Sequence, residues 1–415
     1  MRAVRAGLAS VVLLVPTTIL APAAGASSLP ECKVKIGTTE PRSAPWEHRR
    51  LDARRVWPIT DGRGVLVAVI DSGFNAEQGQ LRKIHVRAGV NVSGAFGPAD
   101  TRDCVYHGTA VAGIIAAPRV DGVYFTGIAP GVTIMPIKEQ QGDEQPGTNH
   151  IAQAIDAAVA ARADVINVSI TTSVGTPELE RAVAAAERAD IVIVAAGGND
   201  GSSSNLAAFP AAYSTKYPNT LAVAMTDQND QVSGVSTRGT YINIAAPGKG
   251  VELPMPKVGY LASQDGTSFA AAVVTGTVAL VRAAHPTLSA AQVVSRIEAT
   301  ADAPPGVGVP NAAYGYGIVN PYLAVTAIRD DSARPVPVES SKPIPAVPRR
   351  PAANRHRQHL ALGVGAALLG LAVVVALAGA VVRRSSPLSG PHRDRTDPTQ
   401  HSDFRETPTR STEWR

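Results

Sequence analysis

The sequence predicts an α/β fold in which a parallel sheet is covered by helices on both faces. Short runs of β-branched and other apolar residues alternate with alanine-rich stretches of helical period. The strand-like runs are apolar throughout, which is typical of strands that are buried on both faces. Asp71 and Asn199 each lie just past the end of such a run, and ligands of parallel sheets bind at the carboxyl ends of the strands.

The expected elements fall between residues 51 and 330. In chain order they are a strand at 64–70, a helix at 108–116, a helix at 149–162, a strand at 164–169, a helix at 177–189, a strand at 191–195 and a helix at 268–284. Strands that alternate with helices favour βαβ units and therefore a parallel sheet. The 280 residues of this region are consistent with one α/β domain.

Each end of the chain carries a hydrophobic segment. Residues 1–26 read as a signal peptide, because arginines at positions 2 and 5 precede an apolar stretch and a small-residue cleavage site. Residues 360–382 are 23 consecutive uncharged, apolar residues, enough to cross a bilayer. Arginines lie on both sides of this second segment, so charge does not orient it. If the signal peptide directs export of residues 27–359, the segment at 360–382 is a stop-transfer anchor.

These features divide the chain into six expected parts. They are a signal peptide at 1–26, an N-terminal extension at 27–50, the α/β domain at 51–330, a proline-rich linker at 331–359, a transmembrane helix at 360–382 and a polar cytoplasmic tail at 383–415. The six prolines of the linker favour an extended spacer. The α/β domain is therefore expected at the cell membrane, on its extracytoplasmic side.

Charge and cysteine content narrow the possible functions. The net charge of +5 is small for 415 residues and comes largely from arginines near the ends, and there is no nucleic-acid-binding motif. Cys32 and Cys104 lack the close spacing of a zinc site, and in an oxidising compartment we expect them to form one disulfide bond. Asp227, Asp230 and Asp302 read as loop acids, so neither a metal site nor a cofactor is expected.

Three short blocks carry the chemistry. They are Val67 to Gly73, His107 to Ile115 and Gly266 to Gly276, and they contain Asp71, His107 and Ser268. A serine hydroxyl is a poor nucleophile until a base removes its proton, and imidazole titrates near neutral pH. A carboxylate fixes one tautomer and one orientation of the imidazole and stabilises its protonated form.

In the order Asp, His, Ser, these blocks resemble the subtilisin family of serine proteases, over roughly residues 50–330. The resemblance implies a serine endopeptidase with Asp71, His107 and Ser268 as its catalytic triad. It implies an oxyanion hole made by the Ser268 backbone N–H, at the positive end of a helix, and by the Asn199 side-chain amide. The family's cleft segments, which bind peptide as an added strand, match Ser169, Ile170, Thr171, Ala195, Ala196 and Gly197.

Three departures from the family pattern bear on function. Ala272 stands where proline is usual, which we expect to alter helix stiffness and not chemistry. Thr171 stands where glycine is usual, and its side chain is expected to narrow the cleft and restrict substrates. Residues 27–50 are too few for the folding propeptide of many secreted relatives, so activation by its removal is not expected. This extension is instead expected to wrap the domain, tied to it by the Cys32–Cys104 disulfide.

The whole architecture is similar to that of the mycosins, membrane-anchored subtilases that accompany type VII secretion systems. Cys104, three residues before His107, fits this resemblance, as does Gly-Thr-Ser-Phe at 266–269. The resemblance implies limited proteolysis of a protein or peptide substrate and association with a secretion membrane complex. The alternative is a mainly structural subunit of that complex, whose protease activity is dispensable.

Overall fold

A parallel sheet lies at the centre of the part of the chain that the computed structural model describes, residues 35–94, 97–139 and 148–331. Its strands are β1 Leu66–Asp71, β2 His85–Val86, β3 Val90–Asn91, β4 Thr133–Lys138, β5 Val165–Val168, β6 Val192–Ala196, β7 Thr220–Thr226 and β8 Ile244–Pro247. The order across the sheet is β2-β4-β1-β5-β6-β7-β8, with β3 also beside β4. Every described pair in this sheet is parallel, so the predicted α/β class is confirmed.

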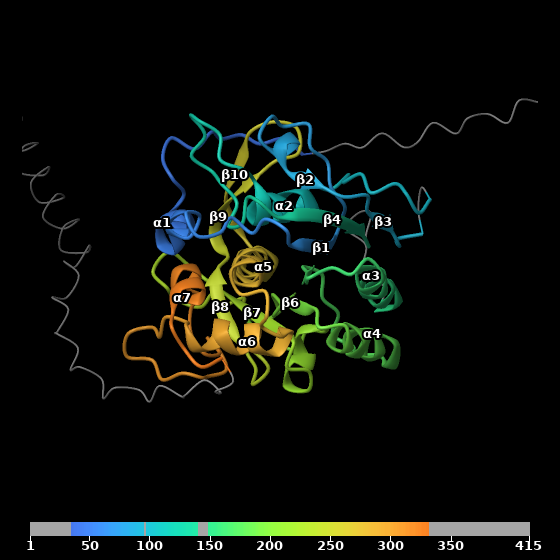
Figure 1. Ribbon diagram of the computed structural model, residues 1–415, viewed down its shortest axis with the longest axis vertical. Helices are drawn as coiled ribbons and strands as arrows, with labels where there is room; N and C mark the ends of the chain where they lie inside the picture. The colour runs from blue at the N-terminus through green and yellow to red at the C-terminus, as the bar shows by residue number, and fades with distance from the viewer. Residues whose placement is uncertain (1–34, 95–96, 140–147, 332–415) are drawn as a thin grey trace, which may run out of the picture. The chain divides into compact units, whose positions relative to one another are not determined.

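Helices cover both faces of the sheet, as Figure 1 shows. They are α1 Trp46–Leu51, α2 His107–Ala116, α3 Thr148–Ala160, α4 Pro177–Arg188, α5 Thr267–Ala284, α6 Ala290–Ala299 and α7 Pro321–Thr326. Alternate residues of β1 enter two separate cores: Val67 and Val69 pack with α2 and α5, whereas Ala68 and Ile70 pack with α3 and α4. This division explains why the strands are apolar throughout, since neither face meets water.

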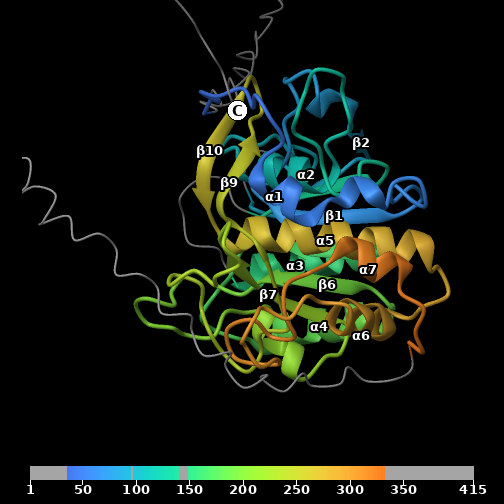
Figure 2. The same ribbon diagram turned by 90° about the vertical axis from the view of Figure 1, so that its left-hand side faces the viewer.

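Helix α5 runs through the middle of the described part in both views (Figures 1 and 2). By length and composition this helix could cross a membrane, but 83% of its most apolar window is buried inside the protein. It is therefore the core helix of the domain. The segments expected as signal peptide, membrane helix and tail lie outside the described residues, as does the linker beyond Asp331. All described residues belong to the first of two compact units, residues 1–344.

An antiparallel hairpin stands apart from the main sheet and leads the chain to Ser268. It consists of β9, Lys249–Pro254, and β10, Tyr260–Asp265. The predicted elements did not include this hairpin. The N-terminal extension packs against this hairpin. Thr39 forms a β-bridge with Tyr260, and the Trp46 indole donates to the carbonyl of Gly250 at 3.0 Å.

Arg50, at the end of this extension, joins it to two distant loops. Its guanidinium forms ion pairs with Asp230 at 2.8 Å and with Asp302 at 3.0 Å. These two carboxylates are among the three acids that the sequence analysis assigned to loops, and they hold α1 against the domain.

A buried arginine also fixes the other end of the described chain. Arg296 of α6 is 1% exposed, and its guanidinium pairs with both carboxylate oxygens of Asp331, at 2.9 and 2.8 Å. The same side chain donates to the carbonyls of Ala324 and Ala327, each at 2.6 Å. The residue at which the proline-rich sequence begins is thus bound to the core of the domain.

Candidate active site

Three separate elements bring Asp71, His107 and Ser268 together at the carboxyl end of the sheet. Asp71 is the last residue of β1, His107 is the first residue of α2 and Ser268 is the second residue of α5. Gly108 permits this approach, because a Cβ at that position would lie 2.3 Å from the carbonyl oxygen of Gly73. Each side chain is therefore held by the start or the end of a buried element.

The three side chains form one chain of hydrogen bonds. His107 Nδ1 lies 2.8 and 2.9 Å from the two carboxylate oxygens of Asp71. His107 Nε2 lies 2.9 Å from Ser268 Oγ. The geometry matches a neutral imidazole that donates from Nδ1 to the carboxylate and accepts the serine proton at Nε2.

Burial and charge set the basicity of the imidazole. Asp71 is 0% exposed and its Oδ1 also accepts the N–H of Ser72 at 2.7 Å. Burial of His107 disfavours its protonated form, but the carboxylates of Asp71 and, less strongly, Asp103 outweigh this, so the pKa of His107 is raised above its ordinary value. The Phe269 ring packs 5.2 Å from the imidazole, while the His107 side chain stays 24% exposed and open to a substrate.

Asn199 lies beside the serine with one end of its amide already occupied. Its Oδ1 accepts the backbone N–H and the hydroxyl of Thr267, both at 3.0 Å. The side chain is exposed, so its Nδ2 remains as the end that can donate to a bound group. Ser268, at the second position of α5, has a backbone N–H with no acceptor inside its own helix, and together these donors suit a developing oxyanion.

Thr267 is a functional residue that the sequence analysis read only as part of a motif. It is 0% exposed, and its hydroxyl also accepts the N–H of Gly198 at 3.2 Å. A single hydroxyl thus orders both the Asn199 amide and the turn that precedes it. The signal was its place beside Ser268, but sequence gives no means of knowing which way the hydroxyl points.

The six residues matched to a peptide cleft differ in exposure. Ser169 and Thr171 are half-buried, whereas Ile170, Ala195 and Ala196 are buried. Ala195 and Ala196 pair with β7 inside the sheet. Gly197 donates to the carbonyl of Val223 at 2.8 Å and accepts the Tyr241 hydroxyl at 2.8 Å. Of the six, Ser169 and Thr171 keep the most surface for a substrate.

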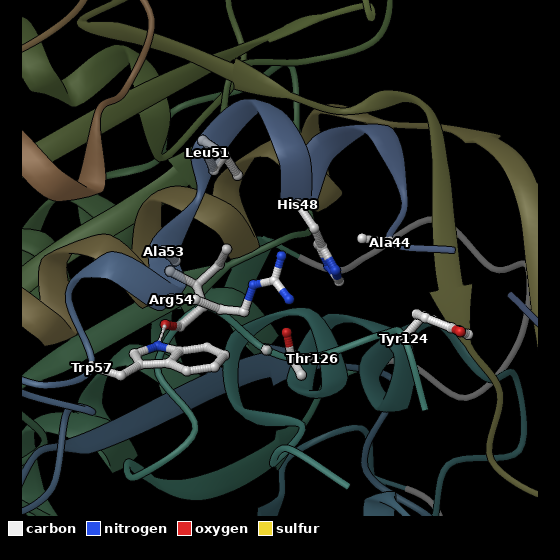
Figure 3. A pocket seen from close by; sticks show the side chains of 10 residues that line it. Ala44, His48, Leu51, Ala53, Arg54, Trp57, Tyr124 and Thr126 are labelled. Carbon is white, nitrogen blue, oxygen red and sulfur yellow. Dashed lines mark hydrogen bonds between the residues drawn. The ribbon is translucent and has the colours of Figure 1, made fainter. Parts of the chain in front are cut away.

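Two small cavities lie where α1 packs on the domain. Figure 3 shows one of them, lined by the side chains of His48, Arg54, Trp57 and Thr126 among others. Its volume of about 10 Å³ holds one water molecule at most. The second, of the same volume, is lined by Glu47, Glu252 and Phe269 among others, so it reaches the residue that follows Ser268.

Cys104 lies three residues before His107 and is disulfide-bonded. Cys32 lies outside the described residues. Within the described ranges, no group of three or more histidine, cysteine, aspartate or glutamate side chains is arranged to hold a metal ion.

The model of the family described as "Subtilase family" matches residues 62–317. Subtilisin E of Bacillus subtilis is 35% identical over 243 residues, which are 58% of this chain and 61% of that protein. Mycosin-4 of Mycobacterium tuberculosis is 34% identical over 378 residues, with 79% of this chain and 80% of mycosin-4 covered.

Solved structures give the same result. The crystal structure of MycP1 from the ESX-1 type VII secretion system has a TM-score of 0.63 and 27% identity, and the match covers 74% of this chain and 92% of that one. A chain in the periplasmic assembly from the ESX-5 inner membrane complex has a TM-score of 0.63 and 30% identity, with 77% and 93% covered.

Proposed function

The chain belongs to the subtilase family, and from this premise we propose that it is a serine endopeptidase with Asp71, His107 and Ser268 as its catalytic triad. The observation that carries the proposal is the unbroken hydrogen-bond chain from Asp71 through His107 to Ser268 Oγ. A structural serine at a helix start needs neither a histidine at 2.9 Å nor a buried carboxylate behind that histidine.

The geometry supports a two-step acyl transfer. His107 Nε2 takes the hydroxyl proton as Ser268 Oγ attacks the scissile carbonyl carbon. The charge that develops on the carbonyl oxygen is met by the Ser268 N–H and by Asn199 Nδ2. The imidazolium then gives its proton to the leaving amine. Water repeats the sequence in reverse and frees the acyl group, while Asp71 keeps the imidazole oriented throughout.

We place this endopeptidase at the cell membrane, with residues 51–330 on the extracytoplasmic side. Support comes from the apolar segments at 1–26 and 360–382. It also comes from the similarity to mycosin-4 over 79% of the chain. Thr171, a half-buried member of the matched cleft, supports limited rather than degradative cleavage of a protein substrate. The same relatives support association with a type VII secretion complex.

The principal experiment uses the full chain in membranes and a fluorophosphonate probe. Labelling is expected in the wild type and not in Ser268→Ala, because only an activated serine reacts. Ser202→Ala, a change at an exposed serine of a neighbouring loop, should label like the wild type. A folded wild type that does not react, or a label on another serine, would show the proposal to be wrong.

A mainly structural role is the second candidate. One observation favours it: a similar chain was solved as part of a periplasmic assembly from an inner membrane complex. A strain with Ser268→Ala separates the roles. Secretion that survives this change but fails on deletion of the whole chain would make assembly primary, whereas secretion lost in both strains would make cleavage primary.

We also propose that Cys104 is bonded to Cys32. Cys104 is disulfide-bonded, and the sequence holds no third cysteine. Such a bond closes a loop of about 70 residues, worth on the order of 4 kcal/mol in the chain-entropy model. Peptide mapping without reduction should yield a linked pair that contains residues 32 and 104. An intermolecular Cys104 dimer on a non-reducing gel would contradict it.

A further inference from the structure

A second buried carboxylate, Asp103, lies behind the catalytic residues in the loop before α2. It is 0% exposed. Its carboxylate accepts five hydrogen bonds, from Ser72 Oγ at 2.9 Å, Val105 N at 2.9 Å, Tyr106 N at 2.8 Å, Thr109 N at 2.9 Å and Thr109 Oγ1 at 2.6 Å. All five donors are neutral, so they hold the charge in place without cancelling it.

The Ser72 hydroxyl connects Asp103 to both members of the acid–base pair. It donates to Asp103 and accepts the N–H of Gly108 at 2.9 Å. Ser72 follows Asp71, and its own N–H donates to Asp71 Oδ1 at 2.7 Å. Gly108 follows His107. One hydroxyl, oriented by Asp103, therefore ties the end of β1 to the start of α2.

Asp103 also holds a strained residue next to the histidine. Tyr106 has φ of 99°, a left-handed conformation that is costly for a bulky side chain. The backbone N–H groups of Tyr106 and Val105 both donate to Asp103 Oδ1. Strain of this kind persists only where surrounding bonds fix it, and here those bonds set the direction in which α2 begins and therefore the position of His107.

The charge of Asp103 acts on the imidazole as well. The titratable groups that influence His107 are Asp71 from β1 and Asp103, and α5 presents Ser268 and Phe269. The Lys138 ammonium interacts electrostatically with Asp103 and donates to the carbonyl of Arg102 at 2.6 Å, while Asp100 pairs with Arg102. A fixed negative charge in a buried site favours imidazolium, the form that His107 takes when Ser268 attacks.

We infer that Asp103 is a positioning residue that orients His107 through Ser72 and the first turn of α2 and stabilises its protonated form during catalysis. This inference rests on the proposed endopeptidase function. Two carboxylates then share the placement of His107. Asp71 binds Nδ1 of the ring, and Asp103 fixes the backbone that carries the ring.

The test is the rate of fluorophosphonate labelling of the full-length protein across pH 5 to 9. In Asp103→Asn the midpoint of the acid limb is expected to fall by about 0.5 to 1 pH unit, since removal of a negative charge lowers the pKa of a nearby imidazole. The maximal labelling rate should fall about tenfold, with little change in the concentration of probe that gives half-saturation. Asp100→Asn removes a neighbouring, ion-paired charge and should match the wild type.

Two milder variants keep the inference testable if Asp103→Asn does not fold. Ser72→Ala and Thr109→Val each remove one hydroxyl bond to Asp103 and leave its charge. Both should lower the maximal labelling rate several-fold while the midpoint stays at the wild-type pH. Wild-type rates in both variants would overturn the inference, and so would a folded Asp103→Asn protein with an unmoved midpoint. A wild type that does not label at all would instead defeat the proposed function.

Discussion

Asn199 Oδ1 receives two hydrogen bonds from Thr267, one from its backbone N–H and one from its hydroxyl, each 3.0 Å long. The acceptor end of the amide is thus saturated by a buried residue, and the donor end is left for the substrate. The orientation of this amide is determined before any substrate arrives, which is the condition under which a hydrogen-bond donor stabilises a transition state at no reorganisation cost.

Replacement of Asn199 should therefore lower turnover more than binding. In Asn199→Leu we expect kcat to fall about 10²–10³-fold, the range known for loss of one oxyanion donor in a subtilisin, with KM nearly unchanged. Steady-state kinetics on a peptide cleaved by the wild type will measure both constants. A rise in KM at constant kcat would instead assign Asn199 to ground-state binding.

Loss of the Thr267 hydroxyl should have a smaller effect of the same kind. Thr267→Val keeps the size of the side chain and the backbone N–H bond but removes one of the two bonds to Asn199, so kcat should fall about tenfold. Thr277→Val is the matched control, because Thr277 is also buried in α5 and its hydroxyl donates to the carbonyl of Val273, one turn back in the same helix, at 3.0 Å. Equal losses in the two variants would point to helix stability rather than amide orientation.

Activity should depend on pH through His107. Its pKa is raised, because the carboxylate of Asp71 and the bond to it outweigh the effect of burial. Only the neutral imidazole accepts the serine proton, so labelling should be full above this raised pKa and be lost as pH falls through it. The midpoint of the pH–rate profile is expected above 6.5. A midpoint below that value would mean that burial dominates.

Stability should depend on pH through Glu47, which is 4% exposed and lines the cavity behind Phe269. Burial raises the pKa of Glu47 to about 7. The N–H of Glu252, which donates to Glu47 Oε1 at 3.1 Å, lowers this pKa but does not outweigh burial. A carboxyl with a raised pKa favours the folded state below its unfolded pKa, and that contribution is lost as pH rises through the folded value. The melting temperature should thus fall between about pH 4.5 and 7.

Glu47→Gln, which mimics the protonated acid, should flatten this slope and protect the amides of α1 from hydrogen exchange at pH 8. Glu298 is the comparison, since burial raises its pKa to about 7 as well. Glu298→Gln should likewise weaken the pH dependence of the melting temperature, but it should not protect the amides of α1 from hydrogen exchange. If α1 exchanges equally fast in Glu47→Gln and the wild type, Glu47 does not control the attachment of this helix.

The seven elements predicted from the sequence match observed ones to within about two residues at each end, because their apolar patterns are continuous, but the buried strands β4 and β7 and helix α6 were not among them. The strand expected at 64–70 is observed at Leu66–Asp71, and the helix expected at 268–284 begins one residue earlier, at Thr267. The helix expected to reach 162 ends at Ala160, because Arg162 takes a positive φ of 57°. A segment that is buried on both faces is apolar throughout and can be recognised in the sequence, whereas the residue at which a helix ends cannot be read from composition.

The parts that sequence could not provide are those set by distant contacts. Helix α1 has only six residues, and it is held by residues about 200 positions away, as where the Trp46 indole donates to the backbone carbonyl of Gly250. The same is true of Thr267 and Asp103: both stand in or beside recognised motifs, yet their roles depend on which hydroxyl or carboxylate the fold places opposite them. Single-sequence patterns carry no such pairing information.

The bond between Arg296 and Asp331 has a mechanical meaning if the linker is tethered. Tension applied to the chain beyond residue 331 reaches the domain first at Asp331, and the buried Arg296 passes that load to α6, to the carbonyl of Ala324 in α7 and to that of Ala327 just after it. The load is thereby shared between α6 and α7 instead of being carried by the chain after α7 alone. In a tethered chain, this link would let a pull at Asp331 be borne by the buried Arg296 and the two helices bound to it.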